Sequence, residues 1–155
     1  MPFPSIVVRQ ATVEDAAVVS VLVQHLLGEL GGFPPGESAA LIAWCEHLLA
    51  SERYIALLAH DAAGPPPGLL TLYECPALYI AGYLGWIQEF YVVPQARSLG
   101  IGKQLLAAAV AYGRERGWQR LEVNTPDRNA WPRTVAFYRR EGFVGDSIHL
   151  SMPLT

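Results

Sequence analysis

The stretch "QARSLGIGKQLL", from Gln95 to Leu106, says most about the architecture of this chain. Gly100 and Gly102 stand where an apolar helix is about to begin, beside Lys103, the only lysine. Glycine weakens a helix by about 1 kcal/mol relative to alanine, and a cation near a helix N-terminus opposes the helix dipole. Both choices become favourable if an anion collects there, because free N–H groups then approach it closely. The stretch therefore predicts an anion site between a strand and a helix.

Two well-known phosphate loops are excluded by spacing. A Walker A loop would need glycine at position 97 and serine or threonine at position 104, where the chain has Arg97 and Gln104. A GxGxxG dinucleotide loop would need a third glycine at position 105, which is Leu105. The loop belongs to a different class of anion site.

Composition indicates one globular domain, residues 1–155. Hydrophobic residues make up 52% of the 155 and charged residues 16%, which is enough for a substantial core. The net charge is −3 with no dense basic cluster, so no nucleic-acid partner is expected. No signal peptide and no apolar run of about 18 residues is found, which predicts a cytoplasmic protein without a membrane partner. The two cysteines and four histidines lack ligand spacing, so free thiols and no metal are expected.

Apolar periodicity and turn residues predict the element order β-α-α-β-β-β-α-β-α-β. Thr12 and Asp15 form a capping-box pattern at the start of the first helix. This order mixes hairpins with crossovers, and it predicts an α+β fold whose mixed, mostly antiparallel central sheet is flanked by helices. Strands are expected at residues 5–9, 53–60, 68–73, 83–93, 119–125 and 147–154, and helices at residues 11–30, 38–50, 103–116 and 132–141.

Three motifs together resemble one family. Arg97-x-x-Gly100-x-Gly102, after a strand ending in Val-Val-Pro, is similar to the acyl-coenzyme-A signature of the GCN5-related N-acetyltransferase (GNAT) superfamily. "RQATVEDAAVV" (9–19) resembles the entry of that family, and "FYRREGF" (137–143) resembles its closing motif. Because the three occur in the family's order over nearly the whole chain, the chain is identified as a member, closest in layout to the small-amine, diamine-type acetyltransferases.

The resemblance implies an acetyl-CoA-dependent acyltransferase that moves an acetyl group to a primary amine by direct attack on the thioester. It also implies a homodimer. The loop amides would hold the pyrophosphate, and the main chain at the end of the preceding strand would hold the pantetheine. The cofactor-binding residues expected on this basis are Phe90, Tyr91, Val92, Val93, Arg97, Ser98, Leu99, Gly100, Ile101, Gly102 and Lys103.

The resemblance assigns catalytic roles to Tyr138 and Glu89. Tyr138 matches the family tyrosine that acts as general acid, and the alternative is that Tyr138 is an aromatic residue that only packs in the core. Because Phe137 and Tyr138 lie about 100° apart around the helix, the two side chains are expected to face different surroundings. The position where the family usually has glutamate holds Gln88, which cannot accept a proton. Glu89 is therefore expected to act as the general base or as the partner of the substrate ammonium. Strand alternation places Glu89 with Ile87 and Tyr91 on one face, unless a bulge re-aims it. A glutamate bonded within the sheet is the alternative.

The acceptor pocket of this family is built by the first two helices, their connecting loop and the strand before the cofactor loop. By that resemblance the substrate-binding residues expected here are Gln88, Glu29 and Trp86, with Glu37 as a further carboxylate. A family asparagine that touches coenzyme A falls on Trp131, and the nearest asparagine is Asn129. Three functions stay open: transfer to a small-molecule amine, transfer to a protein or peptide amine, and a coenzyme-A-binding module without turnover.

Overall fold

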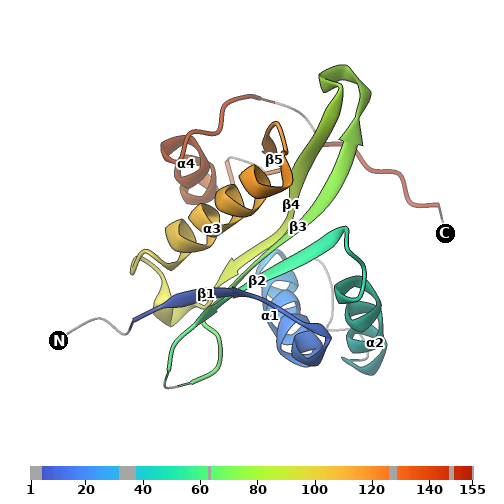
Figure 1. Cartoon of the computed structure of the whole chain (residues 1–155). Coiled ribbons are helices and arrows are strands. Elements are labelled where there is room, and N and C mark those ends of the chain that lie inside the picture. Colours follow the sequence, from blue (N-terminus) through green and yellow to red (C-terminus); the bar gives the residue numbers. More distant parts are fainter. Residues whose placement is uncertain (1–4, 32–37, 63, 126–128, 147–148, 155) are drawn as a thin grey trace.

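The computed structural model describes residues 5–31, 38–62, 64–125, 129–146 and 149–154 (Figure 1). Within these residues the α-helices are α1 (Ala16–Glu29), α2 (Ser38–Leu49), α3 (Ile101–Arg116) and α4 (Pro132–Arg140). The strands are β1 (Val7–Gln10), β2 (Tyr54–His60), β3 (Gly68–Ala77), β4 (Gly82–Val92) and β5 (Leu121–Val123). Short 3₁₀ helices occur at η1 (Val13–Asp15), η2 (Leu78–Ile80) and η3 (Pro94–Ala96).

The five strands form one sheet in the order β1-β2-β3-β4-β5. The first three pairings are antiparallel, while β5 runs parallel to β4 after the crossover through α3. The expected α+β fold with a mixed, mostly antiparallel sheet is confirmed.

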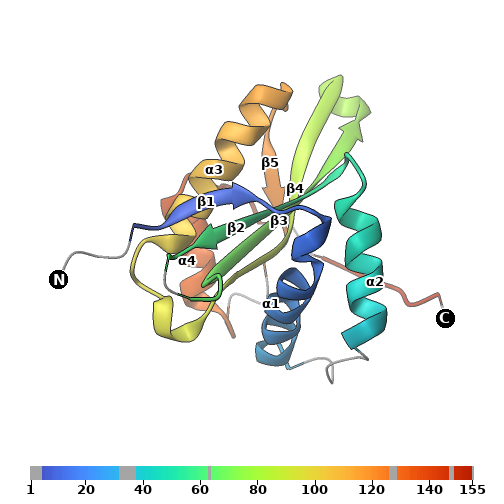
Figure 2. The ribbon, with the colours of Figure 1, turned by 60° about the horizontal axis from the view of Figure 1, so that its bottom comes forward.

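Helices cover both faces of the sheet. Figures 1 and 2 show α3 and α4 on one face and α1 and α2 on the other. Alternate residues of β2 divide accordingly: Leu57 packs in the cluster with α3 and α4, and Leu58 packs in the cluster with α1 and α2. Because both faces are covered, β2 and β3 are near-continuous apolar runs rather than alternating ones.

A β-bulge in β4 changes the expected facing of its side chains. Leu70 pairs with Phe90 and Leu72 pairs with Ile87, so two residues of β4, 88 and 89, stand opposite Thr71. Ile87 and Phe90 consequently both pack toward α3, although an odd spacing separates them. The expectation that Ile87 shares a face with Glu89 is wrong for this reason, since the extra residue shifts the alternation by one.

The Trp118 side chain packs between β4 and α3, next to the pairing of β4 with β5. A Cβ atom at Gly85 would lie 2.2 Å from the Trp118 ring, and one at Gly113 would lie 2.9 Å from it. Both glycines are therefore required for the indole to fit between β4 and α3. The indole N–H donates to Glu74 at 2.6 Å, which fixes its orientation.

The strand expected at residues 147–154 is absent from the part of this segment that the structure describes. Residues 149–154 form no strand, and Leu150, Met152 and Leu154 are each more than 80% exposed. Their alternating pattern is typical of a strand, but a strand also needs a partner, and β5 ends at Val123. Residues 147 and 148 lie outside the described residues.

The start of α1 follows the sequence pattern. The Thr12 N–H donates to Asp15 Oδ2 at 2.8 Å, which is one half of the predicted capping box. Arg9 forms a bidentate pair with the same carboxylate, and this pair holds the pKa of Asp15 well below its usual range. Among the residues described, no helix is long and apolar enough to span a bilayer.

Candidate active site

The loop between η3 and α3 presents a row of main-chain donors. The N–H groups of residues 98–103 have no main-chain acceptor within the described chain, and the first helical bond runs from Gln104 N–H to the Gly100 carbonyl at 3.1 Å. Ser98 and Gly100 adopt φ angles of +66° and +83°, in the left-handed region. Such loop conformations at a helix N-terminus bring successive amides together as an anion site. The left-handed φ explains why glycine stands at position 100.

Gly102 is needed for a different reason. It lies in the first turn of α3, and a Cβ atom there would lie 3.6 Å from both Phe137 and Phe90. These are ordinary contact distances, so one methyl group fits while a larger side chain meets two aromatic rings. Lys103 is exposed on the same turn.

The Arg97 side chain turns away from the loop amides and ties the loop to α1. Its Nε donates to the Val92 carbonyl at 2.9 Å, and its Nη2 lies 2.7 Å and 2.9 Å from the two carboxylate oxygens of Glu29. The guanidinium also lies over the Tyr91 ring at 5.6 Å. The assignment of Glu29 to substrate binding stays a prediction, and its carboxylate already has a cationic partner.

The C-terminal half of β4 has an open edge beside the loop. β5 pairs with β4 only at Gly85–Ile87 within the described residues, so β4 continues beyond this pairing toward Val92. Of the main-chain groups at its end, the Val92 carbonyl accepts from Arg97 and the Val93 N–H donates to Pro67 at 2.9 Å. The remaining main chain from Phe90 onward stays a predicted contact for the cofactor.

Tyr138 lies in the core on the α3 side of the sheet. It is 5% exposed, and its ring centroid lies 6.1 Å from that of Phe90 and 5.3 Å from that of Phe143. Burial raises the pKa of its hydroxyl above the ordinary tyrosine value, so this group stays protonated near neutral pH. Phe137 also contacts Phe90, at 5.7 Å. The expectation that Phe137 and Tyr138 face different surroundings is therefore wrong, because the large Phe90 ring reaches both.

Glu89 is held in a hydrogen-bond network on the opposite face, toward α1 and α2. The Tyr54 hydroxyl donates to Glu89 Oε2 at 3.0 Å, and the Thr71 hydroxyl donates to the same oxygen. The Glu89 N–H donates to Thr71 Oγ1 at 3.0 Å, so the one hydroxyl hydrogen of Thr71 is directed at the carboxylate. Oε1 has no hydrogen-bond partner among the described residues. One carboxylate oxygen is thus anchored and the other is available.

The pKa of Glu89 is raised by burial, and the two hydroxyl donors offset part of this rise. Tyr54 experiences the reciprocal effect: burial and the neighbouring carboxylate raise the pKa of its hydroxyl. Tyr54 therefore stays a donor, and Glu89 has the raised pKa expected of a general base.

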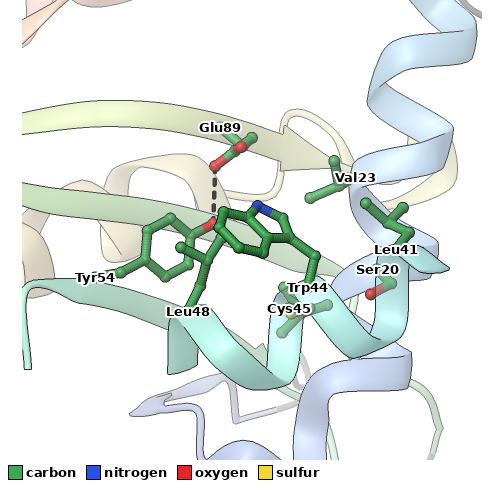
Figure 3. A pocket seen from close by; sticks show the side chains of 9 residues that line it. Ser20, Val23, Leu41, Trp44, Cys45, Leu48, Tyr54 and Glu89 are labelled. Carbon is green, nitrogen blue, oxygen red and sulfur yellow. Dashed lines mark hydrogen bonds between the residues drawn. The ribbon is translucent and has the colours of Figure 1, made fainter. Parts of the chain in front are cut away.

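A small cavity of about 100 Å³ opens beside Glu89 (Figure 3). Figure 3 shows Trp44, Cys45 and Leu48 of α2 lying across from Tyr54 and Glu89 of the sheet. We call this cavity the Glu89 pocket. Its lining residues are Val19, Ser20, Val23, Leu41, Trp44, Cys45, Leu48, Tyr54 and Glu89.

The structure does not bring all the predicted site residues together. Gln88 is exposed, and Trp86 packs against Tyr73 with ring centroids 6.3 Å apart; neither lines the Glu89 pocket. Glu37 lies outside the described residues. Tyr54 and Thr71 were missed by the sequence analysis, since they stand 35 and 18 positions before Glu89 and no local pattern links them.

The two cysteines lie in different elements, Cys45 in α2 and Cys75 in β3. Cys45 and Cys75 are both free, and burial raises the pKa of the Cys45 thiol. In the described residues no three histidine, cysteine or acidic side chains gather in a way that would hold a metal ion.

The acetyltransferase (GNAT) family model matches residues 21–143. The chain belongs to this family. It is an N-acetyltransferase, as its curated relatives are.

Two relatives act on named amines. Aminoalkylphosphonate N-acetyltransferase of Salmonella typhimurium is 34% identical over 139 residues, covering 87% of this chain and 82% of the relative. Glucosamine 6-phosphate N-acetyltransferase 1 of Oryza sativa is 28% identical over 133 residues, covering 82% of this chain and 76% of the relative. A crystal structure of a predicted acetyltransferase with acetyl-CoA from Clostridium acetobutylicum is similar with a TM-score of 0.78 and 19% identity over 96% of each chain, which shows the shared fold.

Proposed function

We propose that this enzyme transfers the acetyl group of acetyl-CoA directly to a primary amine of a small molecule, with Glu89 accepting the proton of the amine and Tyr138 supplying one to the departing sulfur. The observation that carries the proposal is the Glu89 pocket: a half-buried carboxyl with one anchored oxygen and one available oxygen lines a cavity beside the open end of β4.

The residues present fit acetyl-CoA. Six consecutive amides, from Ser98 to Lys103, lack main-chain partners in the described chain, as a pyrophosphate site requires. The main chain from Phe90 to Val93 would hold the pantetheine along the open edge of β4. Acetyl-CoA supplies the acetyl group activated as a thioester.

The two proposed catalytic groups approach β4 from different faces. Glu89 and Phe90 are consecutive; Glu89 lies toward α1 and α2, whereas Phe90 contacts Tyr138 on the α3 side. Glu89 Oε1 would take a proton from the acceptor ammonium, since an amine attacks only when neutral. Tyr138, which is protonated near neutral pH, would donate its proton to the departing thiolate, and the second proton that the nitrogen loses on becoming an amide would restore the hydroxyl.

The curated relatives favour a small molecule over a protein amine, because both are named for small amines. The family assignment favours an enzyme over a binding module without turnover. The homodimer remains a prediction from the resemblance.

Release of free coenzyme A thiol from acetyl-CoA, measured with a panel of small primary amines, tests this function. The wild type should release thiol only with an amine, and Glu89→Gln should lower kcat/KM by about 10²–10⁴-fold. Glu52→Gln, which changes an exposed carboxyl outside the pocket, is the matched control and should act like the wild type. An undiminished rate in Glu89→Gln would overturn the role of Glu89.

A further inference from the structure

The lining of the Glu89 pocket contains one carboxyl group and no cation. Its other polar groups are the Ser20 and Tyr54 hydroxyls, the Cys45 thiol and the Trp44 indole N–H, all neutral. The thiol and the phenol are kept protonated, since burial raises the pKa of both. The pocket therefore carries at most a single negative charge, on Glu89.

The lining includes no arginine, lysine or histidine, and His25 of α1 contacts the Tyr91 ring instead. Arg97 is bound to Glu29 and to the Val92 carbonyl, and Arg9 is bound to Asp15. His47 stacks on the Trp44 indole, with centroids 5.0 Å apart, and is not part of the lining. The chain between α1 and α2, residues 30–37, contains no lysine, arginine or histidine. An anionic group entering the pocket would find neutral donors but no cationic partner in the lining, and burying an anion without a counter-charge beside the Glu89 carboxyl is strongly disfavoured.

The remaining walls are apolar. Val19, Val23, Leu41 and Leu48 surround the cavity, and Trp44 stands with them although it is 57% exposed. A large aromatic residue left this exposed on a cavity wall gains free energy when an apolar ligand covers it.

We propose, on the basis of the function above, that the acceptor is a primary monoamine whose nitrogen is attached to a short apolar group and which carries no anionic group. Its ammonium would pair with Glu89, while its hydrocarbon part would contact Trp44 and the aliphatic wall. This class differs from the phosphonate and phosphate amines in the names of the two curated relatives.

A matched amine series tests this substrate class by free thiol release at one pH. n-Butylamine, 4-aminobutyrate and putrescine share a four-carbon chain and end in a methyl group, a carboxylate and a second ammonium. We expect kcat/KM to rise about fourfold per methylene from ethylamine to n-butylamine. We also expect n-butylamine to exceed 4-aminobutyrate, putrescine and 2-aminoethylphosphonate by at least about tenfold.

A positive charge introduced into the pocket provides a second test of the substrate class. Leu41→Arg should lower kcat/KM for n-butylamine and raise it for 4-aminobutyrate, which reverses the ratio between them. Leu150→Arg adds the same charge at a residue that is 86% exposed and outside the lining, and it should leave the ratio unchanged. Thermal melts with and without acetyl-CoA show whether each variant is folded and binds the cofactor.

The outcomes separate the two proposals. If 4-aminobutyrate or 2-aminoethylphosphonate equals or exceeds n-butylamine, and Glu89→Gln still abolishes turnover, the substrate class is wrong and the proposed function stands. If no amine gives Glu89-dependent thiol release although acetyl-CoA raises the melting temperature, both proposals are overturned.

Discussion

The Tyr54 hydroxyl donates a hydrogen bond to Glu89 Oε2 at 3.0 Å, from a strand two positions away in the sheet. Together with Thr71 it anchors one oxygen of the carboxyl and leaves the other available to the pocket. Tyr54 is thus a positioning residue for Glu89, because its hydroxyl donates to the carboxylate.

Tyr54→Phe should lower kcat by about 10-fold, the value of a lost hydrogen bond to a charged group. Because the Tyr54 donor lowers the pKa of Glu89, its loss should raise this pKa further. The acidic limb of the kcat/KM profile should therefore move to higher pH, a change that a purely structural role would not produce. An unshifted limb with a lowered rate would remove the positioning role.

Glu89→Gln should change the pH dependence of activity as well as its size. Without a base, the rate should follow the fraction of free amine and rise steadily with pH, so the deficit relative to the wild type should shrink in alkaline solution. Rate profiles of both proteins with one amine measure this effect. A deficit that stays constant with pH would argue against proton transfer to Glu89.

The same substitution has a consequence for stability. The pKa of Glu89 is higher in the folded protein than in the unfolded chain, so folding stability is lost as pH rises through the folded pKa. Glu89→Gln lacks this ionisation, and its amide oxygen can still accept from Tyr54 and Thr71. Denaturant unfolding should show the variant gaining relative to the wild type at neutral pH, with the gain disappearing below the ordinary glutamate pKa of about 4.3.

Tyr138→Phe should lower kcat by about 10²-fold or more if the hydroxyl supplies a proton. Affinity for acetyl-CoA should stay nearly unchanged, since the ring packing against Phe90 and Phe143 is kept. Thiol-release kinetics and a melt with saturating acetyl-CoA measure the two quantities separately. A wild-type rate would leave Tyr138 as a packing aromatic.

Alanine at Gly100 should destabilise the fold, whereas alanine at Gly102 should not. Gly100→Ala forces a side chain into the left-handed region, at φ +83°, and should destabilise the fold by about 1–2 kcal/mol. Gly102→Ala meets only ordinary contacts and should not be destabilising, whereas Gly102→Phe should abolish the acetyl-CoA-dependent rise in melting temperature. For wild type, about 100 times the dissociation constant of acetyl-CoA should add roughly 2.7 kcal/mol, or roughly 5–10 °C. If Gly102→Phe keeps that rise, the loop is not the cofactor site.

Glu29→Gln decides between the two roles open to Glu29. Since its partner Arg97 is 46% exposed, loss of the pair should cost no more than about 1 kcal/mol. The KM for the amine should stay unchanged if Glu29 only holds the loop. A rise of tenfold or more would instead support the substrate-binding role that the sequence suggested.

The sequence alone determined the family and the α+β fold, and it predicts the anion loop. Each depends on local patterns: the glycines and Lys103 at a helix start, the capping pattern at Thr12 and Asp15, and the closing motif around Tyr138. Short-range rules suffice for such features, because the residues that interact are close in the chain. For residues 149–154 the final strand was wrongly predicted by the same rules, since alternation says nothing about whether a partner strand exists.

Only the tertiary structure decided how Glu89 is held and what surrounds it. The bulge opposite Thr71, the hydroxyl of Tyr54 and the wall around Trp44 come from four segments that meet only in the folded sheet. Burial and these donors set the pKa of the carboxyl, and neither is a property of its neighbours in sequence. The loop proposed to hold the cofactor can thus be recognised in the sequence, whereas the pocket proposed to bind the amine forms only when the chain folds.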